Sequence, residues 1–504
     1  MIKGEFNKER VFQFLSFVKN RLIERWGFVL SAILLFLIFL ILKRSNLDIP
    51  IKLCALALIL SVVLILFMGK EVHKNAFAII LCFGLLFSFT TPVFDTPDEN
   101  AHMLRTLYTV GGNLVLTNID EDLNVSKDYD NINSQFGKNI YENNIKDFHH
   151  DEDKVGNIWL KVTNAYSFIS YIPQSIGVII GRVLNLDLYW IFYLGRIINL
   201  LFYGLVISYA IKITPIFKNV FLVAATIPIA VYMASSYNQD VFSMALGFLI
   251  VAYYIYLFNQ EKNMIGIKEI SIYTLLCSLM AFTKLPYVLL IGLIIFIAPE
   301  KFKKRSYYLV SYLSIVVVAC VSIIWLKQYA SISPPNTLVG VSMDGQLRYI
   351  FSEPLKTIKL IGNVLLSNMN IPTSMFLFGW LSYGSSEIGL IYLFFLGAMM
   401  IFYPREDVQV RTVRWGSFLV SSAIYIAICL SMYMTWTPVG ADYIQGIQGR
   451  YFVGLLVLMS IFMNIGPRNN QLDPVTLNKY NLLVTYIPIY FLLISFTLTL
   501  NKYY

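Results

Sequence analysis

Long apolar blocks separated by short polar segments run through most of the chain. A helix rises about 1.5 Å per residue, so roughly 20 apolar residues cross a 30 Å hydrocarbon core. The pattern therefore predicts an all-α polytopic membrane protein with about 13 transmembrane helices. The predicted spans lie near residues 26–42, 51–68, 75–91, 190–211, 219–234, 241–258, 270–283, 287–299, 307–326, 387–403, 415–434, 451–465 and 482–500.

Residues 1–25 have a different pattern, because charged and apolar residues alternate there at helical spacing. Such spacing is typical of an amphipathic helix that lies on a membrane surface. We expect this helix on the cytoplasmic face, followed by a single transmembrane domain over residues 26–504. Its apolar positions are Phe14, Leu15, Val18, Leu22 and Ile23.

Two segments decide the topology, and the distribution of Lys and Arg favours one arrangement of each. We expect residues 166–184 to lie flat on the outer face, and residues 270–299 to form two short helices broken at 284–286. Both choices keep the basic loops 259–269 and 300–306 inside, where Lys and Arg concentrate. The predicted protein has its N-terminus inside and its C-terminus outside. Its large external segments are 92–189, which carries juxtamembrane helices, and 327–386.

Composition agrees with this interpretation. The chain is 57% hydrophobic and 14% charged, with a mean hydropathy of +0.65. The net charge of +9 comes largely from short basic loops, so it indicates contact with anionic lipid and no nucleic acid. All five cysteines lie inside apolar blocks, which argues against a disulfide framework or a zinc site. The sequence has no phosphate-binding loop, so ATP-driven transport by this chain alone is not expected.

The most unusual segment follows the third predicted span and runs from Thr91 to His102. Two prolines end the helix there, and the carboxylates of Asp95, Asp98 and Glu99 lie within five residues. Acidic residues in the first turn of a helix have an ordinary explanation, because they complement the helix dipole. Carboxylates at a lipid–water boundary are nevertheless costly to desolvate and tend to mark a site. We therefore treat these three as candidate catalytic residues.

Four other polar features fall on the same external side of the predicted topology. Lys284 and Arg450 lie at the outer ends of spans, where snorkelling to the interface is an alternative explanation. The same alternative applies to Arg196, six residues into its span. We expect these cations and the carboxylates to converge on one outer site. The four features are residues 235–240, 283–287, 379–380 and 445–452.

The run His149-His150-Asp151-Glu152-Asp153 carries side chains that can bind a metal. Consecutive residues rarely ligate one ion well, and the surrounding loop is uniformly polar. We therefore expect a solvated charge run here.

Several of these motifs resemble the bacterial membrane-protein family called "domain of unknown function 2142", over most of residues 75–465. That family in turn resembles the type C glycosyltransferases (GT-C fold), such as the lipid A aminoarabinose transferases and the protein mannosyltransferases. Those enzymes carry an Asp-Glu pair in the first external loop, flat juxtamembrane helices and a Thr-Lys-x-Pro element. The present chain departs from them at His102, where the transferases often have Tyr, and in two extra N-terminal spans. The motifs that carry the resemblance are Pro97-Asp98-Glu99 with His102, Thr283-Lys284-Leu285-Pro286-Tyr287, and Gly446-x-Gln448-Gly449-Arg450-Tyr451-Phe452.

The resemblance implies an inverting glycosyltransferase on the outer face of a bacterial plasma membrane. It would move a sugar from a polyprenyl (undecaprenyl) phosphate to an envelope polysaccharide, a teichoic-acid-like polymer or a glycolipid. Asp98 would be the general base, with Glu99 and Asp95 orienting the acceptor or, for Asp98 and Glu99, holding a divalent metal such as Mg or Mn. Lys284 and Arg450 would bind the lipid phosphate. The other expected substrate contacts are His102, Arg105, Arg196, Asp240, Tyr287, Gln448 and Tyr451.

Two other functions stay open from the sequence. A flippase or exporter of lipid-linked sugars would use the same carrier, but transporters place their binding charges at mid-membrane depth. A polysaccharide polymerase or ligase would share the carrier and the external face, and is expected to rely on Arg and His instead of a carboxylate base.

Overall fold

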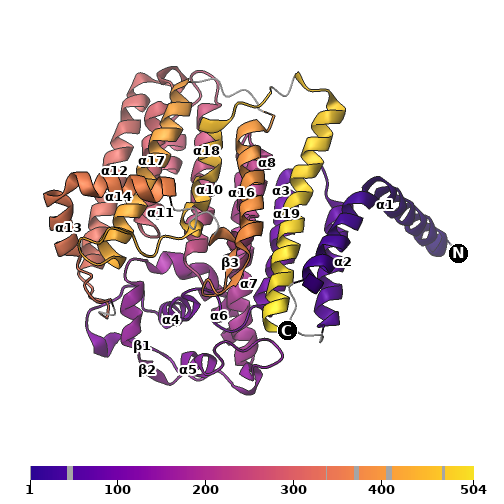
Figure 1. Cartoon of the computed structure of the whole chain (residues 1–504), viewed down its shortest axis with the longest axis horizontal. Helices are drawn as coiled ribbons and strands as arrows, with labels where there is room; N and C mark the ends of the chain where they lie inside the picture. Colours follow the sequence, from indigo (N-terminus) through magenta and orange to yellow (C-terminus); the bar gives the residue numbers. More distant parts are fainter. Residues whose placement is uncertain (1, 43–48, 336–337, 368–373, 405–410, 468–470) are drawn as a thin grey trace.

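Helices packed side by side make up most of the structure, a computed structural model that describes residues 2–42, 49–335, 338–367, 374–404, 411–467 and 471–504. Figure 1 shows α4, α5, β1 and β2 gathered at one end of the bundle. The α-helices are α1 (Ile2–Leu42), α2 (Ile51–Phe67), α3 (Val72–Thr90), α4 (Glu99–Val110), α5 (Asp128–Asn133), α6 (Ile172–Val183), α7 (Leu188–Ile213), α8 (Lys218–Ala225), α9 (Pro228–Ala234), α10 (Asp240–Phe258), α11 (Ile267–Ala281), α12 (Arg305–Ala330), α13 (Met343–Ser352), α14 (Pro354–Ser367), α16 (Ser386–Phe402), α17 (Arg411–Trp436), α18 (Leu456–Met463) and α19 (Pro474–Tyr503). The 3-10 helices are η1 (Asp120–Asp122), η2 (Ile145–Asp147), η3 (Ile158–Thr163), η4 (Phe168–Tyr171), η5 (Leu285–Phe296), η6 (Pro299–Lys301), η7 (Ser374–Phe376) and η8 (Gly449–Leu455), and two short antiparallel hairpins pair β1 (Asn124–Ser126) with β2 (Lys154–Gly156) and β3 (Leu377–Phe378) with β4 (Tyr383–Gly384).

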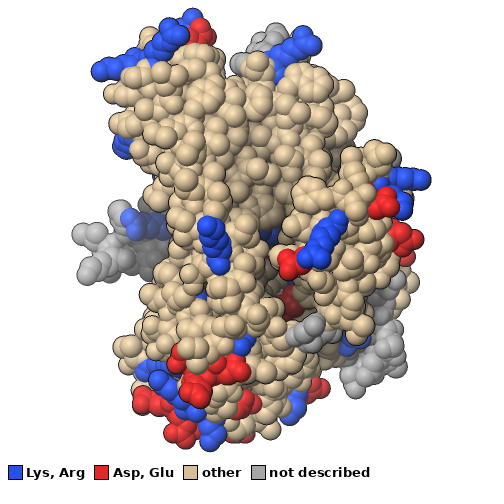
Figure 2. Space-filling view, turned by 90° about the vertical axis from the view of Figure 1, so that its left-hand side faces the viewer, with Lys and Arg blue, Asp and Glu red and all other residues tan. Residues whose placement is uncertain are grey.

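Each predicted apolar block falls on these helical elements, and the prediction of an all-α polytopic membrane protein is confirmed. Among the described residues, seven helices are long and apolar enough to cross a membrane: residues Arg10–Leu42 of α1, and α3, α7, α10, α12, α17 and α19. Shorter apolar helices cover Ile51–Phe67, Phe168–Val183, Leu285–Phe296, Ser386–Phe402 and Gly449–Met463. In Figure 2, charged side chains gather at the two ends of the molecule and on the lobe at the right, and most of the remaining surface is uncharged.

The predicted amphipathic segment and the first predicted span form one continuous helix, α1, so the expected boundary near residue 25 is not a break in the helix. Figure 1 shows the N-terminal part of α1 projecting away from the bundle. Arg25 is buried, and its Nη1 donates to the carbonyls of Ile65 (2.7 Å) and Met68 (3.0 Å) at the C-terminal end of α2. These carbonyls have no partner within their own helix, so Arg25 fixes α1 against the end of α2.

The predicted span 219–234 is wrong as a single helix, because the chain breaks between α8 and α9. Pro228 lies at the first position of α9. Proline has no N–H to continue a helix and disfavours the helical conformation in the residue before it. The break lies deep in the core, where Thr226 and Ile227 are fully buried.

Residues 270–299 form two short elements, as predicted, with α11 ending at Ala281 and η5 beginning at Leu285. The second element packs back against the first. The loops at their far ends meet, because Asn263 N–H donates to Glu300 O (3.0 Å) and Ile265 pairs with Phe302 in a β-bridge. The basic loops 259–269 and 300–306 therefore lie at the same end of the bundle.

The segment 166–184 contains η4 and the short helix α6. The 12 residues of α6 extend about 18 Å, which is too short to cross a 30 Å core. A Cβ added at Gly177 would meet the backbone of Leu194, and one at Gly181 would meet Ile191, so α6 runs back along the first turns of α7. Two glycines allow α6 to approach α7 closely, and that the segment lies flat on the outer face stays a prediction.

Different loops meet at the two ends of the bundle. At one end, Asn219 donates to Tyr403 Oη (2.5 Å) and to Asn481 Oδ1 (2.9 Å), so three intracellular loops of the predicted topology meet there. At the other end, Asn139 of the first external segment donates to Tyr503 O (2.8 Å) near the C-terminus. The candidate catalytic residues lie at this second end.

Candidate functional site

The segment that leaves α3 makes a tight path before α4 begins. Pro92 and Pro97 prevent the helix from continuing, and Phe94 and Asp98 both adopt a left-handed backbone, with φ of 59° and 65°. A non-glycine residue in this conformation is uncommon, and such strained residues concentrate at functional sites. Asp98 stands at the N-cap of α4, yet its carboxylate makes no capping hydrogen bond. A capping hydrogen bond therefore does not account for Asp98.

The carboxylate of Asp98 instead contacts Arg450, whose Nη2 lies 3.1 Å from Asp98 Oδ2. Arg450 Nε also lies 3.2 Å from Asp240 Oδ2, and Lys284 Nζ lies 2.9 Å from Asp240 Oδ1. We call Asp98, Asp240, Lys284 and Arg450 the charged cluster. Its members come from the start of α4, the start of α10, the turn between α11 and η5, and η8. Four segments that are distant in the chain thus bring two carboxylates and two cations together. They alternate in the order Asp98, Arg450, Asp240, Lys284.

The four side chains differ in exposure. Arg450, Asp240 and Lys284 expose only 5%, 4% and 14% of their side chains, whereas Asp98 exposes 47%. Burial lowers the pKa of Lys284, and the neighbouring Asp240 opposes that shift. Snorkelling into solvent does not explain Lys284 or Arg450, because both are buried against acids. Asp98 is the member of the cluster that solvent or a substrate can reach.

Two tyrosines line the cluster. Lys284 Nζ lies 4.2 Å from the centre of the Tyr451 ring, a distance that allows a cation–π contact. The guanidinium carbon of Arg450 lies 5.5 Å from the same ring. Tyr287 Oη donates to the carbonyl of Tyr451 (2.6 Å), which ties η5 to η8. The predicted contacts Tyr287 and Tyr451 therefore border the cluster, and Gln448 at the N-cap of η8 has a buried Oε1 without a hydrogen-bond partner among the described residues.

Glu99 turns away from its neighbour Asp98 and forms a separate buried pair with Arg196. Both side chains are fully buried. Arg196 Nε and Nη2 donate to the two carboxylate oxygens of Glu99, at 2.8 and 2.7 Å. A guanidinium has five N–H donors, and the other three go to carbonyls at the end of α3, those of Ser88, Thr91 and Pro92, each at 2.9 Å.

This pair changes two of our expectations. Arg196 has no donor left for a substrate, so the structure does not support its predicted substrate contact. Burial raises the pKa of Glu99, and the bidentate Arg196 opposes that shift. Because both oxygens of Glu99 face Arg196, we assign Glu99 a structural role at the start of α4 instead of an orienting role toward an acceptor.

Asp95 is held by two tyrosine hydroxyls. Tyr232 Oη donates to Asp95 Oδ2 (2.9 Å), and Tyr503 Oη donates to Asp95 Oδ1 (2.5 Å). Burial raises the pKa of Asp95, and the two hydroxyls oppose that shift. Nearby, Trp380 Nε1 donates to Phe94 O (3.1 Å), so residues 379–380 do reach the acidic segment. Asp95 thus anchors the C-terminal helix and α9 to this segment.

His102 lies one turn along α4 from the acidic pair. Its Nδ1 is 3.0 Å from Tyr171 Oη, and its ring is tilted against the rings of Tyr166 and Tyr171. Burial lowers the pKa of His102 to about 4, so the imidazole is neutral at pH 7. A neutral imidazole can donate or accept a hydrogen bond, but it adds no charge to the site.

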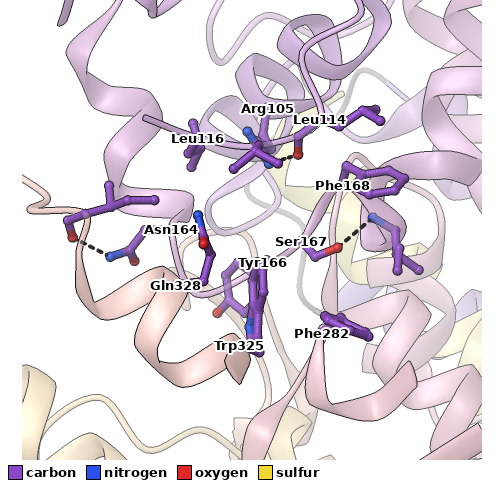
Figure 3. A pocket seen from close by; sticks show the side chains of 13 residues that line it. Arg105, Leu114, Leu116, Asn164, Tyr166, Ser167, Phe168, Phe282, Trp325 and Gln328 are labelled. Atoms are coloured by element: carbon purple, nitrogen blue, oxygen red, sulfur yellow. Dashed lines mark hydrogen bonds between the residues drawn. The ribbon is translucent and has the colours of Figure 1, made fainter. Parts of the chain in front are cut away.

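Arg105, also on α4, is not part of the charged cluster. It is buried, its Nη2 donates to Leu114 O (3.1 Å), and it lines a cavity between the first external segment and the ends of α11 and α12. Figure 3 shows this cavity, with Tyr166 and Trp325 between Arg105 and Phe282.

The predicted metal ligands do not converge. Asp98 faces Arg450, and both oxygens of Glu99 face Arg196. Within the described ranges, no group of three or more His, Cys, Asp or Glu side chains is placed to hold a metal ion. The residues present therefore do not fit the divalent metal that the resemblance allowed, and no step is derived through one.

The run 149–153 is not simply a solvated charge run. His150 Nδ1 lies 2.7 Å from Oδ2 of the fully buried Asp128, and Asp151 N–H donates to Asp128 Oδ1 (2.9 Å). Arg182 of α6 donates to the same carboxylate (2.8 Å). This contact fixes the polar run to α6, and sequence spacing does not predict it because the partners of Asp128 are 22 and 54 residues away.

Sequence reasoning also missed three tyrosines of the site, namely Tyr171, Tyr232 and Tyr503. With 33 tyrosines in the chain, composition singles out none of them. The one available signal is that a buried polar group needs a hydrogen-bond partner, which predicts that Asp95 has a donor without naming it.

These observations define the class of the protein: a polytopic all-α membrane protein with a cluster of alternating acidic and basic side chains at one end of its bundle. The sequence profile of the family described as "Predicted membrane protein (DUF2142)" matches residues 81–459, and the chain belongs to this family. The matched residues include all four members of the charged cluster. No curated protein and no solved structure matches the chain.

Proposed function

We propose that the protein is a membrane glycosyltransferase that moves a sugar from a polyprenyl phosphate to an envelope polymer or glycolipid. One observation carries this proposal: of the three carboxylates in the acidic segment, Asp98 alone is exposed and faces a buried arginine. A base and a phosphate-binding cation side by side are what this transfer requires. A guanidinium binds phosphate oxygens through paired N–H groups.

The reaction needs one base and no matching acid. The acceptor hydroxyl attacks the anomeric carbon, the bond from that carbon to the phosphate oxygen breaks, and the acceptor proton passes to Asp98. The lipid phosphate leaves with the bonding electron pair as a weakly basic anion. Arg450 and Lys284 stabilise its charge in a site that excludes most water. The neutral His102 contributes to the wall of the site.

Arg450 is occupied by Asp98 before a substrate binds, and this contact sets an order of events. A donor phosphate that takes the Nη2 group of Arg450 displaces Asp98 from it. Asp98 then loses its contact with Arg450 and is free to accept the proton of the acceptor hydroxyl. Asp240 keeps Lys284 and Arg450 in place throughout. The proposed enzyme therefore activates its base only when the donor is bound.

The proposed orientation has the N-terminus and the basic loops in the cytoplasm, and the charged cluster outside, with thirteen spans in a GT-C-like arrangement. Two facts support it: the loops 259–269 and 300–306 lie together, and the cluster lies at the opposite end of the bundle. Lys and Arg concentrate in cytoplasmic loops.

We expect a cysteine at position 131 to be labelled by an impermeant maleimide in intact cells, and a cysteine at position 304 only after permeabilisation. Asn131→Cys and Lys304→Cys are made separately in a chain without its native cysteines. Labelling of position 304 in intact cells would overturn the orientation.

The function is tested by incubating the purified protein with a labelled polyprenyl-phosphate sugar and isolated envelope polymer. We expect Asp98→Asn to lose transfer, because positioned base catalysis contributes about 10²–10⁴-fold. Asp130→Asn removes an exposed carboxylate from the same external segment and is the matched control. Full transfer by Asp98→Asn would reject the enzyme as proposed and favour an exporter of lipid-linked sugars.

A further inference from the structure

A second cation at this end of the molecule has no counter-charge. Arg105 exposes only 1% of its surface and forms no ion pair with any described residue. Its Nε and Nη1 are buried and have no hydrogen-bond partner in the described part of the chain. Its guanidinium carbon lies 5.2 Å from the Tyr108 ring and 6.0 Å from the Tyr171 ring. Aromatic faces stabilise a cation only partly, and a buried charge without a partner is costly.

The cavity beside Arg105 has a volume of about 200 Å³, room for roughly six waters at 30 Å³ each. Its other walls are mostly apolar, and two of the polar side chains among them, Asn164 and Ser167, already have hydrogen-bond partners. Ser167 Oγ accepts from Ile169 N–H, and the Asn164 amide donates to the carbonyls of Tyr329 and Ile332. A water needs two to four polar partners, so water alone does not suit this space.

The walls come from α4, from residues 164–169 and from the ends of α11 and α12. Trp325 and Gln328 supply the α12 side, and most of α12 faces outward from the protein. Figure 3 shows Trp325 and Tyr166 below Arg105, and the Trp325 ring contacts the edge-on ring of Phe282. The cavity thus adjoins an apolar helix that is long enough to cross a membrane and is mostly exposed on the outside of the protein.

We propose that this cavity binds the head of a lipid that ends in a phosphate monoester, with the phosphate on Arg105 and the first part of the chain against the apolar wall. Nε carries one N–H group and Nη1 carries two, and these unused donors of Arg105 can bind the oxygens of a phosphate. Tyr166 and Tyr171 separate this site from the charged cluster, because both rings also contact His102. The proposal does not depend on the glycosyltransferase function.

The test measures binding of a fluorescent phosphatidic acid to the purified full chain in neutral detergent. All titrations use an Arg450→Ala background, which removes the phosphate contact of the charged cluster. We expect saturable binding in this background, and a dissociation constant raised roughly tenfold to a hundredfold by adding Arg105→Met, the loss of a charged hydrogen bond. Arg348→Met, which removes an exposed arginine on α13, is the matched control and leaves the dissociation constant unchanged.

Two competitors distinguish the source of the phosphate. Unlabelled phosphatidic acid is expected to displace the probe, whereas phosphatidylcholine with the same chains and inorganic phosphate are not. Ile169→Trp narrows the cavity while keeping Arg105, and it is expected to weaken binding even if Arg105→Met does not fold. Equal displacement by inorganic phosphate or by phosphatidylcholine, or unchanged binding in both variants, would overturn the proposal. Absence of sugar transfer by the wild-type protein, with this lipid binding intact, would count against the glycosyltransferase alone.

Discussion

Asp98 and Glu99 are adjacent in the chain, yet their side chains enter two very different ion pairs. The Glu99–Arg196 pair is closed: both side chains are fully buried and every N–H of Arg196 is used. The Asp98–Arg450 contact is open, because nearly half of the Asp98 side chain is exposed and a single Nη2–Oδ2 contact joins the two groups. The left-handed backbone at Asp98 separates the directions of the two side chains.

The difference shows how one acidic motif serves two purposes. A closed, bidentate pair resists rearrangement and fixes the start of α4 against the end of α3. Because a single contact joins Asp98 to Arg450, another anion can replace Asp98 at Arg450 at a modest cost in free energy. Chemistry is therefore expected at Asp98, and stability at Glu99.

The largest expected effect on folding comes from breaking the closed pair. Glu99→Gln leaves the Arg196 charge buried without a counter-charge, and such a loss costs about 3–5 kcal/mol in the free energy of unfolding. Denaturation of the purified protein in detergent measures it. A double variant, Glu99→Gln with Arg196→Met, removes the stranded charge and should regain part of the loss. A Glu99→Gln protein as stable as the wild type would end the distinction between the two pairs.

The open pair is tested at Arg450. Arg450→Ala should weaken donor binding by roughly 2–5 kcal/mol, the cost of truncating a buried charge partner. Arg450→Lys keeps the charge but loses the planar fork, so it should fall between the alanine variant and the wild type. Transfer rate against the concentration of polyprenyl-phosphate sugar gives both values. Unchanged kinetics in Arg450→Ala would mean that the open pair does not hold the donor.

A smaller effect concerns pH, through His102 next to the acidic pair. Burial lowers its pKa from 6.5 to about 4, so between these pH values the unfolded chain binds more protons than the folded one. The contribution of His102 to the free energy of unfolding is fully present above pH 6.5. It is lost as the pH drops through this window, by about 3 kcal/mol in total. His102→Gln should flatten this dependence. An equally steep pH dependence in His102→Gln would assign it to other groups.

The hydrophobic pattern predicted the spans because membrane helices must be apolar over a defined length. It also predicted that Asp240, Lys284 and Arg450 meet, since each lies at the outer end of a span. The break at Pro228 was visible in the sequence but was outweighed by the apolar residues around it. The packing of α6 on α7 depends on Gly177 and Gly181, whose partners the sequence does not identify.

The roles of neighbouring acids were harder to predict. Sequence spacing places Asp98 and Glu99 on one motif, but only the backbone at Asp98 decides that their side chains diverge. Arg196 carried a usable signal, because an arginine inside a span requires a buried partner. The choice of Glu99 as that partner, 97 residues away, follows from tertiary packing alone. The unpaired Arg105 was equally hidden, since nothing in the sequence shows that no acid reaches it.

The most direct test of this account compares Asp98→Asn with Glu99→Gln in one assay of sugar transfer at saturating donor. Turnover is expressed per folded molecule, so that the instability of Glu99→Gln is corrected. The account predicts a loss of about 10²–10⁴-fold for Asp98→Asn and turnover close to the wild type for Glu99→Gln. Equal losses in the two variants, or full turnover in Asp98→Asn, would contradict it.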